Sequence, residues 1–233
     1  MSAPPSSSAL PNEFDLLVIG GGINGAGIAR DAAGRALRVL LVEKGDIAGA
    51  TSSWSSKLIH GGLRYLEHLQ FRLVAEALAE REVLLRIAGH LVWPTQFVMP
   101  HVRELRPRWM IGLGLFLYDH LARRDALPGS ARVRLDRPPY NAGLKSGLVH
   151  GFRYADCRVD DARLVIANAR SARALGAMVA PRTELLRAER RNGRWQAQLR
   201  EGNGAAGTVG TVREVRARAI VNAAGPWVRE ALQ

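Results

Sequence analysis

The 233-residue sequence contains little cysteine, little lysine and no long hydrophobic run. Cys157 is its single cysteine, which excludes an intramolecular disulfide framework and a cysteine-based metal site and fits a reducing compartment. The longest strongly apolar stretch, Trp109 to Leu121, has thirteen residues, whereas a helix that spans a bilayer needs about twenty. We find no internal repeat and expect no metal site. What remains is a globular chain long enough to bury a sizeable core in one or two domains.

The first twelve residues lack the features of a secretory signal. They are rich in serine and proline, without the basic start or the apolar core that a signal peptide has. We therefore expect a disordered tail over residues 1–12.

Basic residues outnumber acidic ones and give a net charge of +12, but the excess is not typical of a nucleic-acid-binding protein. Thirty of the thirty-three basic residues are arginine, scattered along an alanine-, glycine- and leucine-rich chain, as a GC-rich genome could produce. No DNA- or RNA-reading motif accompanies the charge. We expect no nucleic-acid partner, and a basic surface would instead favour phosphorylated substrates or anionic lipid headgroups.

The most informative stretch begins with the apolar run Leu16–Ile19, which lacks helical spacing and is typical of a strand buried on both faces. A G-x-G-x-x-G pattern made by Gly20, Gly22 and Gly25 follows, and an alanine-rich helix is predicted over residues 27–37. Gly20 would permit the tight turn, Gly22 the approach of a pyrophosphate, and Gly25 close packing of the helix on the strand. The helix start would present free N–H groups and its positive dipole end to that phosphate.

A second apolar strand, residues 39–42, ends in Glu43, whose carboxylate can accept hydrogen bonds from a ribose 2′-OH. Strand, turn, helix, strand and acid in this order predict a Rossmann-like dinucleotide-binding unit, which the glycine pattern alone would not. An acid at this position disfavours a 2′-phosphate and therefore NADP. It leaves NAD and FAD open.

A polar segment of small residues, 44–56, and the glycine-containing residues 57–65 come directly after this unit. One interpretation is a surface loop. Small residues and paired glycines also suit a backbone pressed against a planar ligand, and hydroxyl groups can bond phosphate or ring heteroatoms. We favour the second interpretation because the segment continues the nucleotide-binding unit.

Helical spacing predicts three further helices, over residues 69–91, 109–121 and 160–176. We favour a buried position for the apolar helix 109–121 over one that dips into a membrane between its flanking arginines. Residues 92–107 are broken by prolines, and residues 125–150 are typical of a loop. Strands are predicted at residues 178–180, 184–189, 195–200, 208–215 and 219–222, and a helix starts at 228. The middle three strands would form an antiparallel meander with a hairpin turn at Asn192-Gly193.

Several motifs converge on one family. They lie at residues 19–31, 50–53, 55–67, 76–82, 118–121, 160–164 and 221–227. The most specific is residues 55–67, Ser-Ser-Lys-Leu-Ile-His-Gly-Gly-Leu-Arg-Tyr-Leu-Glu. Together the motifs resemble the FAD-dependent, membrane-associated glycerol-3-phosphate dehydrogenases over most of the chain from residue 14 onward.

The sequence departs from that family in two ways. Arg35 is followed by Ala36 where the family has glycine, a change that we place on a helix and expect to be harmless. Members of the family are much longer, and their second signature, a Gly-Gly-Lys segment ending in Tyr-Arg, is absent here, as are the downstream arginine and lysine that would hold the substrate phosphate. The chain resembles the N-terminal half of such an enzyme.

The resemblance implies FAD as cofactor and oxidation of sn-glycerol 3-phosphate to dihydroxyacetone phosphate. Hydride from the substrate C2 would pass to flavin N5, and the electrons would pass to a quinone. The implied location is peripheral, on the anionic cytoplasmic face of the inner membrane, and a homodimer is allowed. Two alternatives stay open: a non-catalytic FAD-binding fragment, and a related FAD-dependent amine or amino-acid oxidase. Residues 55–65 argue against the oxidase.

The expected fold class is α/β: a Rossmann-like FAD/NAD(P)-binding domain, with a parallel sheet and a β-meander, plus part of a substrate or cap domain. After the tail, the FAD-binding domain would comprise residues 13–91 and 151–233. A partial substrate or cap excursion would occupy residues 92–150.

The resemblance also assigns site residues. The FAD pyrophosphate and adenosine ribose would be held by Gly20, Gly22, Gly25, Glu43 and Lys44. The stretch towards the isoalloxazine ring would be lined by Thr51, Ser52, Ser53, Ser56, Lys57, His60, Gly61, Gly62 and Leu63, with Gly225 passing beside the same cofactor. Candidate catalytic residues are Arg64, Tyr65 and His60.

Three of these residues have a plainer alternative. Arg64 could pair with Glu67 at helical spacing instead of contacting substrate. His60 could be a general base, but we favour a structural or flavin-orienting role because no partner can be placed for it. Lys57 could be a solvated surface residue, although its small, uncharged neighbours favour a role in tuning the flavin.

Overall fold

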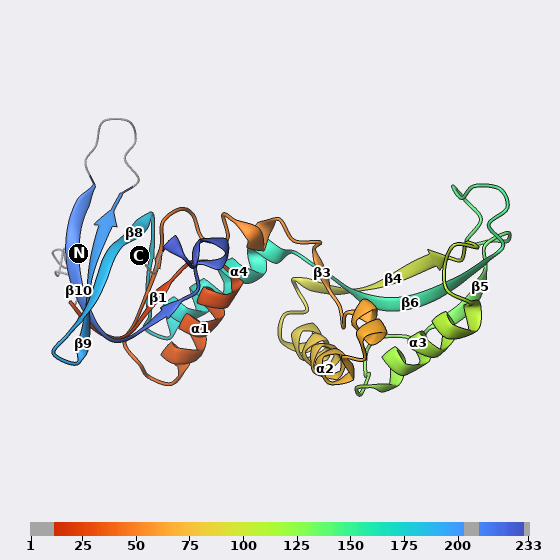
Figure 1. The fold of residues 1–233 in the computed structure, drawn as a ribbon, viewed down its shortest axis with the longest axis horizontal. Helices are drawn as coiled ribbons and strands as arrows, with labels where there is room; N and C mark the ends of the chain where they lie inside the picture. Colours follow the sequence, from red (N-terminus) through yellow and green to blue (C-terminus); the bar gives the residue numbers. More distant parts are fainter. Residues whose placement is uncertain (1–11, 203–209, 231–233) are drawn as a thin grey trace, which may run out of the picture. The chain divides into compact units, whose positions relative to one another are not determined.

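The structure is a computed structural model that describes residues 12–202 and 210–230. These residues form two compact units (Figure 1). Unit 1 contains the residues up to Ser55 and those from Asp161 onward, whereas unit 2 contains Ser56–Asp160. Residues 1–11 of the predicted tail lie outside the described residues. The predicted extent of the FAD-binding domain, residues 13–91 and 151–233, stays a prediction.

Unit 1 is built on a six-stranded mixed sheet. Its elements are β1 (Glu13–Ile19), α1 (Ile23–Gly34), β2 (Val39–Glu43), α4 (Asp161–Ala174), β7 (Met178–Pro181), β8 (Thr183–Arg191), β9 (Arg194–Glu201) and β10 (Thr211–Asn222). The strand order is β7-β2-β1-β10-β9-β8. The first four strands run parallel, and β10, β9 and β8 form an antiparallel meander. The predicted α/β class, with a parallel sheet and a meander, is confirmed.

The strands β1 and β2 contain continuous apolar runs, residues 16–19 and 39–42, because both of their faces are covered there. On one face, Val18 and Leu41 pack against the alanines of α1 and α4, two helices that lie side by side (Figure 1). On the other face, Leu17 and Leu40 pack against the meander, including Leu199. Strands buried in this way have continuous hydrophobic sequences, which is why both were predictable.

The end of α1 corrects one expectation. The helix runs from Ile23 to Gly34 and not over residues 27–37, so Ala36 is not helical. Ala36 has φ 60° and follows the C-cap residue Arg35. Its N–H donates to the Ala33 carbonyl, and the next N–H donates to the Ala32 carbonyl, as in a Schellman motif. Ala36 therefore occupies a left-handed position that favours glycine, so this departure from the family pattern carries strain.

Strand β10 corrects a second expectation, because the strands predicted at 208–215 and 219–222 are one continuous strand from Thr211 onward. Its first half pairs antiparallel with β9, and its second half pairs parallel with β1. The predicted residues before 210 lie outside the described part of the chain. At the predicted hairpin turn between β8 and β9, Asn192 and Gly193 have φ of 49° and 75°, and the turn is confirmed.

Unit 2 has its own antiparallel sheet. Its elements are β3 (Leu58–Ile59), the 3₁₀ helix Leu63–His68, α2 (Phe71–Ile87), β4 (Val92–Pro100), α3 (Arg108–His120), β5 (Ala131–Arg134) and β6 (His150–Val159). The long strand β6 pairs with β3, β4 and β5. Helices α2 and α3 confirm the helices predicted over residues 69–91 and 109–121, and they share a core that includes Val74, Leu78 and Tyr118. The buried position expected for the second helix is wrong for one of its faces, where Trp109, Leu113 and Phe116 are exposed.

None of the four strands of unit 2 was predicted, and the shortest, β3, lies in the segment interpreted as a surface loop or a ligand lining. The proline-broken region contains β4, and the predicted loop 125–150 contains β5. Pro94 and Pro100 fit into β4 because, within the described residues, this strand pairs only with β6, and a proline without an N–H is tolerated on an edge strand. In β6 the charged Asp156 is buried, which interrupts the apolar alternation that would have indicated a strand.

Candidate nucleotide-binding site

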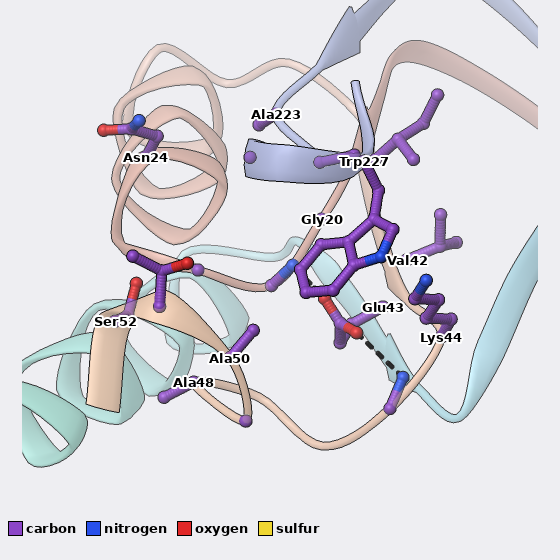
Figure 2. Close-up of a pocket in the computed structure, with 18 of the residues that line it drawn as sticks. Gly20, Asn24, Val42, Glu43, Lys44, Ala48, Ala50, Ser52, Ala223 and Trp227 are labelled. Atoms are coloured by element: carbon purple, nitrogen blue, oxygen red, sulfur yellow. Dashed lines mark hydrogen bonds between the residues drawn. The ribbon is translucent and has the colours of Figure 1, made fainter. Parts of the chain in front are cut away.

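A cavity of about 550 Å³ opens in unit 1 at the carboxyl ends of β1 and β2, where open α/β sheets bind ligands (Figure 2). Four segments line it: the end of β1 with the glycine turn and the start of α1, the end of β2 with the segment up to Ser52, the start of β8, and residues 223–227 with Glu230. Segments distant in the sequence therefore meet around one space that is large enough for a nucleotide.

The glycines of the turn are required by contacts with backbone atoms. Gly20 has φ 110°, and a Cβ there would lie 2.4 Å from the Ala223 carbonyl oxygen. A Cβ on Gly25 would lie 1.8 Å from the carbonyl oxygen of Gly20, so the helix can approach the turn only because Gly25 has no side chain. A Cβ on Gly22 would meet one atom within 4 Å, the Ser52 Oγ at 3.1 Å. Two glycines thus close the turn, and the third leaves its backbone accessible.

The start of α1 faces the cavity without a cap from its own N-cap side chain, because that residue is Gly22. The Ser52 Oγ accepts a hydrogen bond of 2.9 Å from the Ile23 N–H. A helix N-terminus concentrates N–H groups and the positive end of the dipole, which favours a phosphate. Gly22, Ile23 and Ser52 therefore form a fitting site for the pyrophosphate of a dinucleotide.

Glu43 ties the two loops of the cavity together. Its Oε2 accepts a hydrogen bond of 2.7 Å from the Gly21 N–H, and its Oε1 accepts one of 2.8 Å from the Gly45 N–H. Each carboxylate oxygen can accept a further bond, so the same group can also receive a ribose hydroxyl. The side chain is half-buried and lines the cavity beside Lys44 (Figure 2).

Trp227, the last residue of the motif 221–227, forms a wall of the cavity but was not among the predicted site residues. The Lys44 Nζ lies 4.5 Å from the centroid of its ring, in a cation–π contact, and Figure 2 shows the two side chains together. Trp227 follows Gly225, which was predicted to pass beside the cofactor, so proximity in sequence was the available signal. Thr183, Glu184 and Leu185 at the start of β8 had no such signal because the meander brings them to the cavity from far along the chain.

The predicted cofactor residues of unit 1 fall into two groups. Those that line the cavity are Gly20, Gly22, Glu43, Lys44, Thr51, Ser52 and Gly225. Gly25 instead packs behind the turn, and the Ser53 hydroxyl donates to the Ala50 carbonyl in a 3₁₀ turn.

The remaining predicted residues begin unit 2. They are Ser56, Lys57, His60, Gly61, Gly62, Leu63, Arg64 and Tyr65. Gly62 has φ 72° and precedes the 3₁₀ helix that exposes Arg64 and Tyr65. Glu67, the alternative partner of Arg64, forms an ion pair of 3.1 Å with Arg106 instead. Within residues 12–202 and 210–230, no three His, Cys, Asp or Glu side chains gather as metal ligands would.

Comparisons with known proteins agree with this geometry. The sequence pattern of a family described as FAD dependent oxidoreductase matches residues 15–233. Glycerol-3-phosphate dehydrogenase of Pseudomonas aeruginosa is 55% identical over 227 residues, covering 97% of this chain and 43% of that protein. D-erythritol 1-phosphate dehydrogenase of Brucella abortus is 54% identical over 224 residues, covering 96% and 44%.

A solved structure is also similar. The glycerol-3-phosphate dehydrogenase of Bacillus halodurans, complexed with FAD, superposes with a TM-score of 0.67 at 29% identity. The match covers 94% of this chain and 35% of that one. The chain therefore spans less than half the length of each of these three relatives.

Proposed function

Because this chain belongs to the FAD dependent oxidoreductase family, we propose that it is the FAD-binding part of a dehydrogenase that oxidises sn-glycerol 3-phosphate to dihydroxyacetone phosphate. The observation that carries the proposal is the 55% identity to a glycerol-3-phosphate dehydrogenase over 97% of this chain. An amine or amino-acid oxidase is not favoured, because relatives at this level of identity are named as dehydrogenases of polyol phosphates.

The cavity of unit 1 fits the dinucleotide end of FAD. The N–H groups at Gly22 and Ile23 would hold the pyrophosphate, and the Ser52 hydroxyl would exchange its bond to Ile23 for one to a phosphate oxygen. Glu43 would accept hydrogen bonds from the adenosine ribose while it keeps its two backbone donors. Lys44 adds a positive charge at the same wall. These are roles in binding and orientation, and the flavin itself supplies the acceptor for the substrate hydride.

We assign the residues at the start of unit 2 to the flavin and the substrate. Ser56, Lys57 and the turn His60–Leu63 would line the flavin, and Arg64 and Tyr65 would contact the substrate. Arg64 suits this role because a guanidinium binds phosphate or a developing alkoxide through two parallel N–H groups. Arg64 is exposed, and Glu67 pairs with Arg106 instead of with Arg64. The Arg64 guanidinium is therefore available to a ligand.

A second candidate substrate is D-erythritol 1-phosphate, which the name of the Brucella abortus relative contains. The identities of 54% and 55% do not separate the two substrates. Both are polyol phosphates with a secondary alcohol, so the residues that hold the phosphate would serve either one. Discrimination would depend on how much room the site leaves beyond the reacting carbon.

We further propose that the protein works peripherally on the anionic cytoplasmic face of the inner membrane. Helix α3 exposes Trp109, Leu113 and Phe116 by 62%, 50% and 56%, and arginines at 106 and 108 border this apolar surface. No helix among the described residues is both long and apolar enough to cross a bilayer. In a flotation assay, the protein should bind vesicles of phosphatidylglycerol, and added salt should weaken this binding. A protein that does not float with the vesicles at any salt concentration would contradict the peripheral location. The quinone acceptor and the homodimer stay predictions.

The central experiment uses the full-length protein that contains this chain. Reconstituted with FAD, it should reduce dichlorophenolindophenol with glycerol 3-phosphate, and D-erythritol 1-phosphate is assayed in parallel. A yellow holoprotein that oxidises neither phosphate, or only sarcosine and D-amino acids, would overturn the proposal. The 233-residue chain alone should turn over little, because it spans less than half of its relatives.

A further inference from the structure

A network of buried polar side chains in unit 2 is not used by the proposed function. Arg81 of α2, Tyr118 of α3 and Asp156 of β6 are exposed by 3%, 3% and 4%. The Arg81 Nη1 donates a 2.6 Å hydrogen bond to the Asp156 Oδ1, and the Tyr118 hydroxyl donates to the same oxygen at 2.8 Å. Arg81 and Tyr118 belong to two separate stretches that carry the family resemblance, so the fold brings these stretches together.

The network ends on the backbone of the turn His60–Gly62. The Gly61 N–H donates a 2.7 Å hydrogen bond to the Tyr118 hydroxyl, which therefore accepts from the turn while it donates to Asp156. Burial and the Asp156 carboxylate raise the pKa of the Tyr118 hydroxyl well above its usual range, so the proton stays on the tyrosine. A Cβ on Gly61 would lie 2.4 Å from Leu78, so the turn is also packed against α2.

The geometry of the turn selects one tautomer of His60. The Gly62 N–H donates a 3.0 Å hydrogen bond to the His60 Nδ1, so this nitrogen is an acceptor. A neutral imidazole whose Nδ1 accepts carries its proton on Nε2. His60 is an exposed residue, so a ligand can reach its ring.

We propose that Tyr118, Asp156 and Arg81 are positioning residues that hold the His60–Gly62 turn so that His60 acts as a hydrogen-bond donor through Nε2–H and not as a general base. A base would need an unprotonated nitrogen aimed at the ligand, and the one that His60 has is aimed at the Gly62 N–H. The ligand group that fits is an acceptor without a proton, such as a carbonyl, a ring nitrogen or a phosphate oxygen. That this acceptor belongs to the flavin or its substrate rests on the proposed function.

The test follows the His60 tautomer in ¹⁵N-labelled protein of this chain without cofactor. Long-range ¹H–¹⁵N spectra distinguish protonated from unprotonated ring nitrogens, and His60→Gln assigns the signals among six histidines. The wild type should show a protonated Nε2 and an unprotonated Nδ1. A protonated Nδ1 would overturn the proposal, and this result needs no other variant to fold.

Tyr118→Phe then tests whether the network positions the turn. It removes one hydroxyl and keeps the ring, so the Gly61 N–H loses its acceptor. Amide exchange at Gly61 should accelerate about tenfold or more, and the two ¹⁵N shifts of His60 should move towards each other as the second tautomer becomes populated. Unchanged exchange together with an unchanged tautomer would refute the positioning role.

Tyr154→Phe is the matched control. Tyr154 lies on β6 close to Asp156, but its ring stacks on Phe97 and its hydroxyl is not part of the network. Tyr154→Phe should leave both the amide exchange of Gly61 and the ¹⁵N shifts of His60 unchanged. Equal effects of Tyr118→Phe and Tyr154→Phe would contradict the positioning role of Tyr118. Neither readout involves flavin or turnover. The tautomer predicted for His60 can therefore be observed even if the full-length protein oxidises neither polyol phosphate. A different tautomer would likewise not contradict the proposed substrate.

Discussion

The groups that face the cavity of unit 1 are largely backbone, whereas the candidate turn of unit 2 is held by buried side chains. In unit 1, Gly20 and Gly25 bring main-chain atoms close together, and the carboxylate of Glu43 ties two loop N–H groups. In unit 2, a buried cation and a buried carboxylate anchor the turn through Tyr118.

The difference suits two kinds of recognition. Phosphate and ribose are present in all dinucleotides, and main-chain N–H groups can bind them. The positions of these N–H groups depend little on side chains, so few substitutions change them except those that replace a glycine. A turn held by side chains can instead be tuned by single substitutions, but it depends on charges that are costly to leave unpaired. Variants in unit 1 should therefore affect cofactor binding, and variants in the network should first affect local stability.

The largest effect is expected from Arg81→Met, which removes the cation of the network. Asp156 would stay buried without its closest countercharge, which costs about 3–5 kcal/mol. The neighbouring Cys157 reports on this locally because it is fully buried and burial raises the pKa of its thiol to about 11. The wild-type thiol should resist dithionitrobenzoate near pH 8, and Arg81→Met should speed labelling by about a hundredfold or more.

Arg72→Met is the control on the same helix. Arg72 pairs with Glu76 at 2.8 Å, but the two side chains are largely exposed, and such pairs contribute little. In Arg72→Met, Cys157 should be labelled at the wild-type rate. Equal labelling rates in Arg72→Met and Arg81→Met would contradict the claim that the buried ion pair contributes more to stability than the exposed one.

The next largest effect is expected from Gly25→Ala in unit 1. Its new Cβ would lie 1.8 Å from a backbone oxygen, which cannot move aside as a side chain could, so we expect a loss of about 3 kcal/mol in the free energy of unfolding. The full-length protein should also lose its flavin, which the flavin-to-protein absorbance ratio measures. Gly27→Ala, in the same helix with no atom within 4 Å of the new Cβ, should bind FAD normally. Flavin retention by Gly25→Ala would contradict the role given to the turn.

Glu43→Ala should have a smaller but distinct effect. It removes two charge-assisted hydrogen bonds to the loops, and we expect about 2 kcal/mol less stability and at least about tenfold weaker FAD binding. Asp46→Ala serves as control, because Asp46 lines the same cavity but its exposed carboxylate pairs with Arg182. An unchanged absorbance ratio in Glu43→Ala would refute the ribose assignment.

The two units also differ in how well the sequence predicts them. Unit 1 is organised by local signals: apolar runs for β1 and β2, glycines for the turn, and Asn192-Gly193 for the hairpin. The network of unit 2 joins positions 81, 118 and 156, and no local pattern indicates that they meet. The prolines in β4 and the buried charge in β6 do not fit the usual pattern of a strand, so the sheet of unit 2 was not predicted. The part of the cavity formed by the glycine turn was predictable. The part formed by the start of β8 was not, because β8 is far from the glycine turn in the sequence and only the fold brings it to the cavity.

The smallest effect compares two helix ends within unit 1. Both α1 and α4 end in the same pair of backbone bonds, but the left-handed residue is Ala36 in the first and Gly176 in the second. Ala36→Gly should raise the free energy of unfolding by about 1 kcal/mol, because it removes the steric cost of a Cβ in the left-handed region. Gly176→Ala should lower it by a similar amount, since no atom lies within 4 Å of its Cβ and only the conformational cost changes. Urea titrations of both variants measure these shifts through the change in midpoint at constant slope. Shifts of the same sign would show that the two helix ends are not equivalent and that something other than φ sets the cost at Ala36.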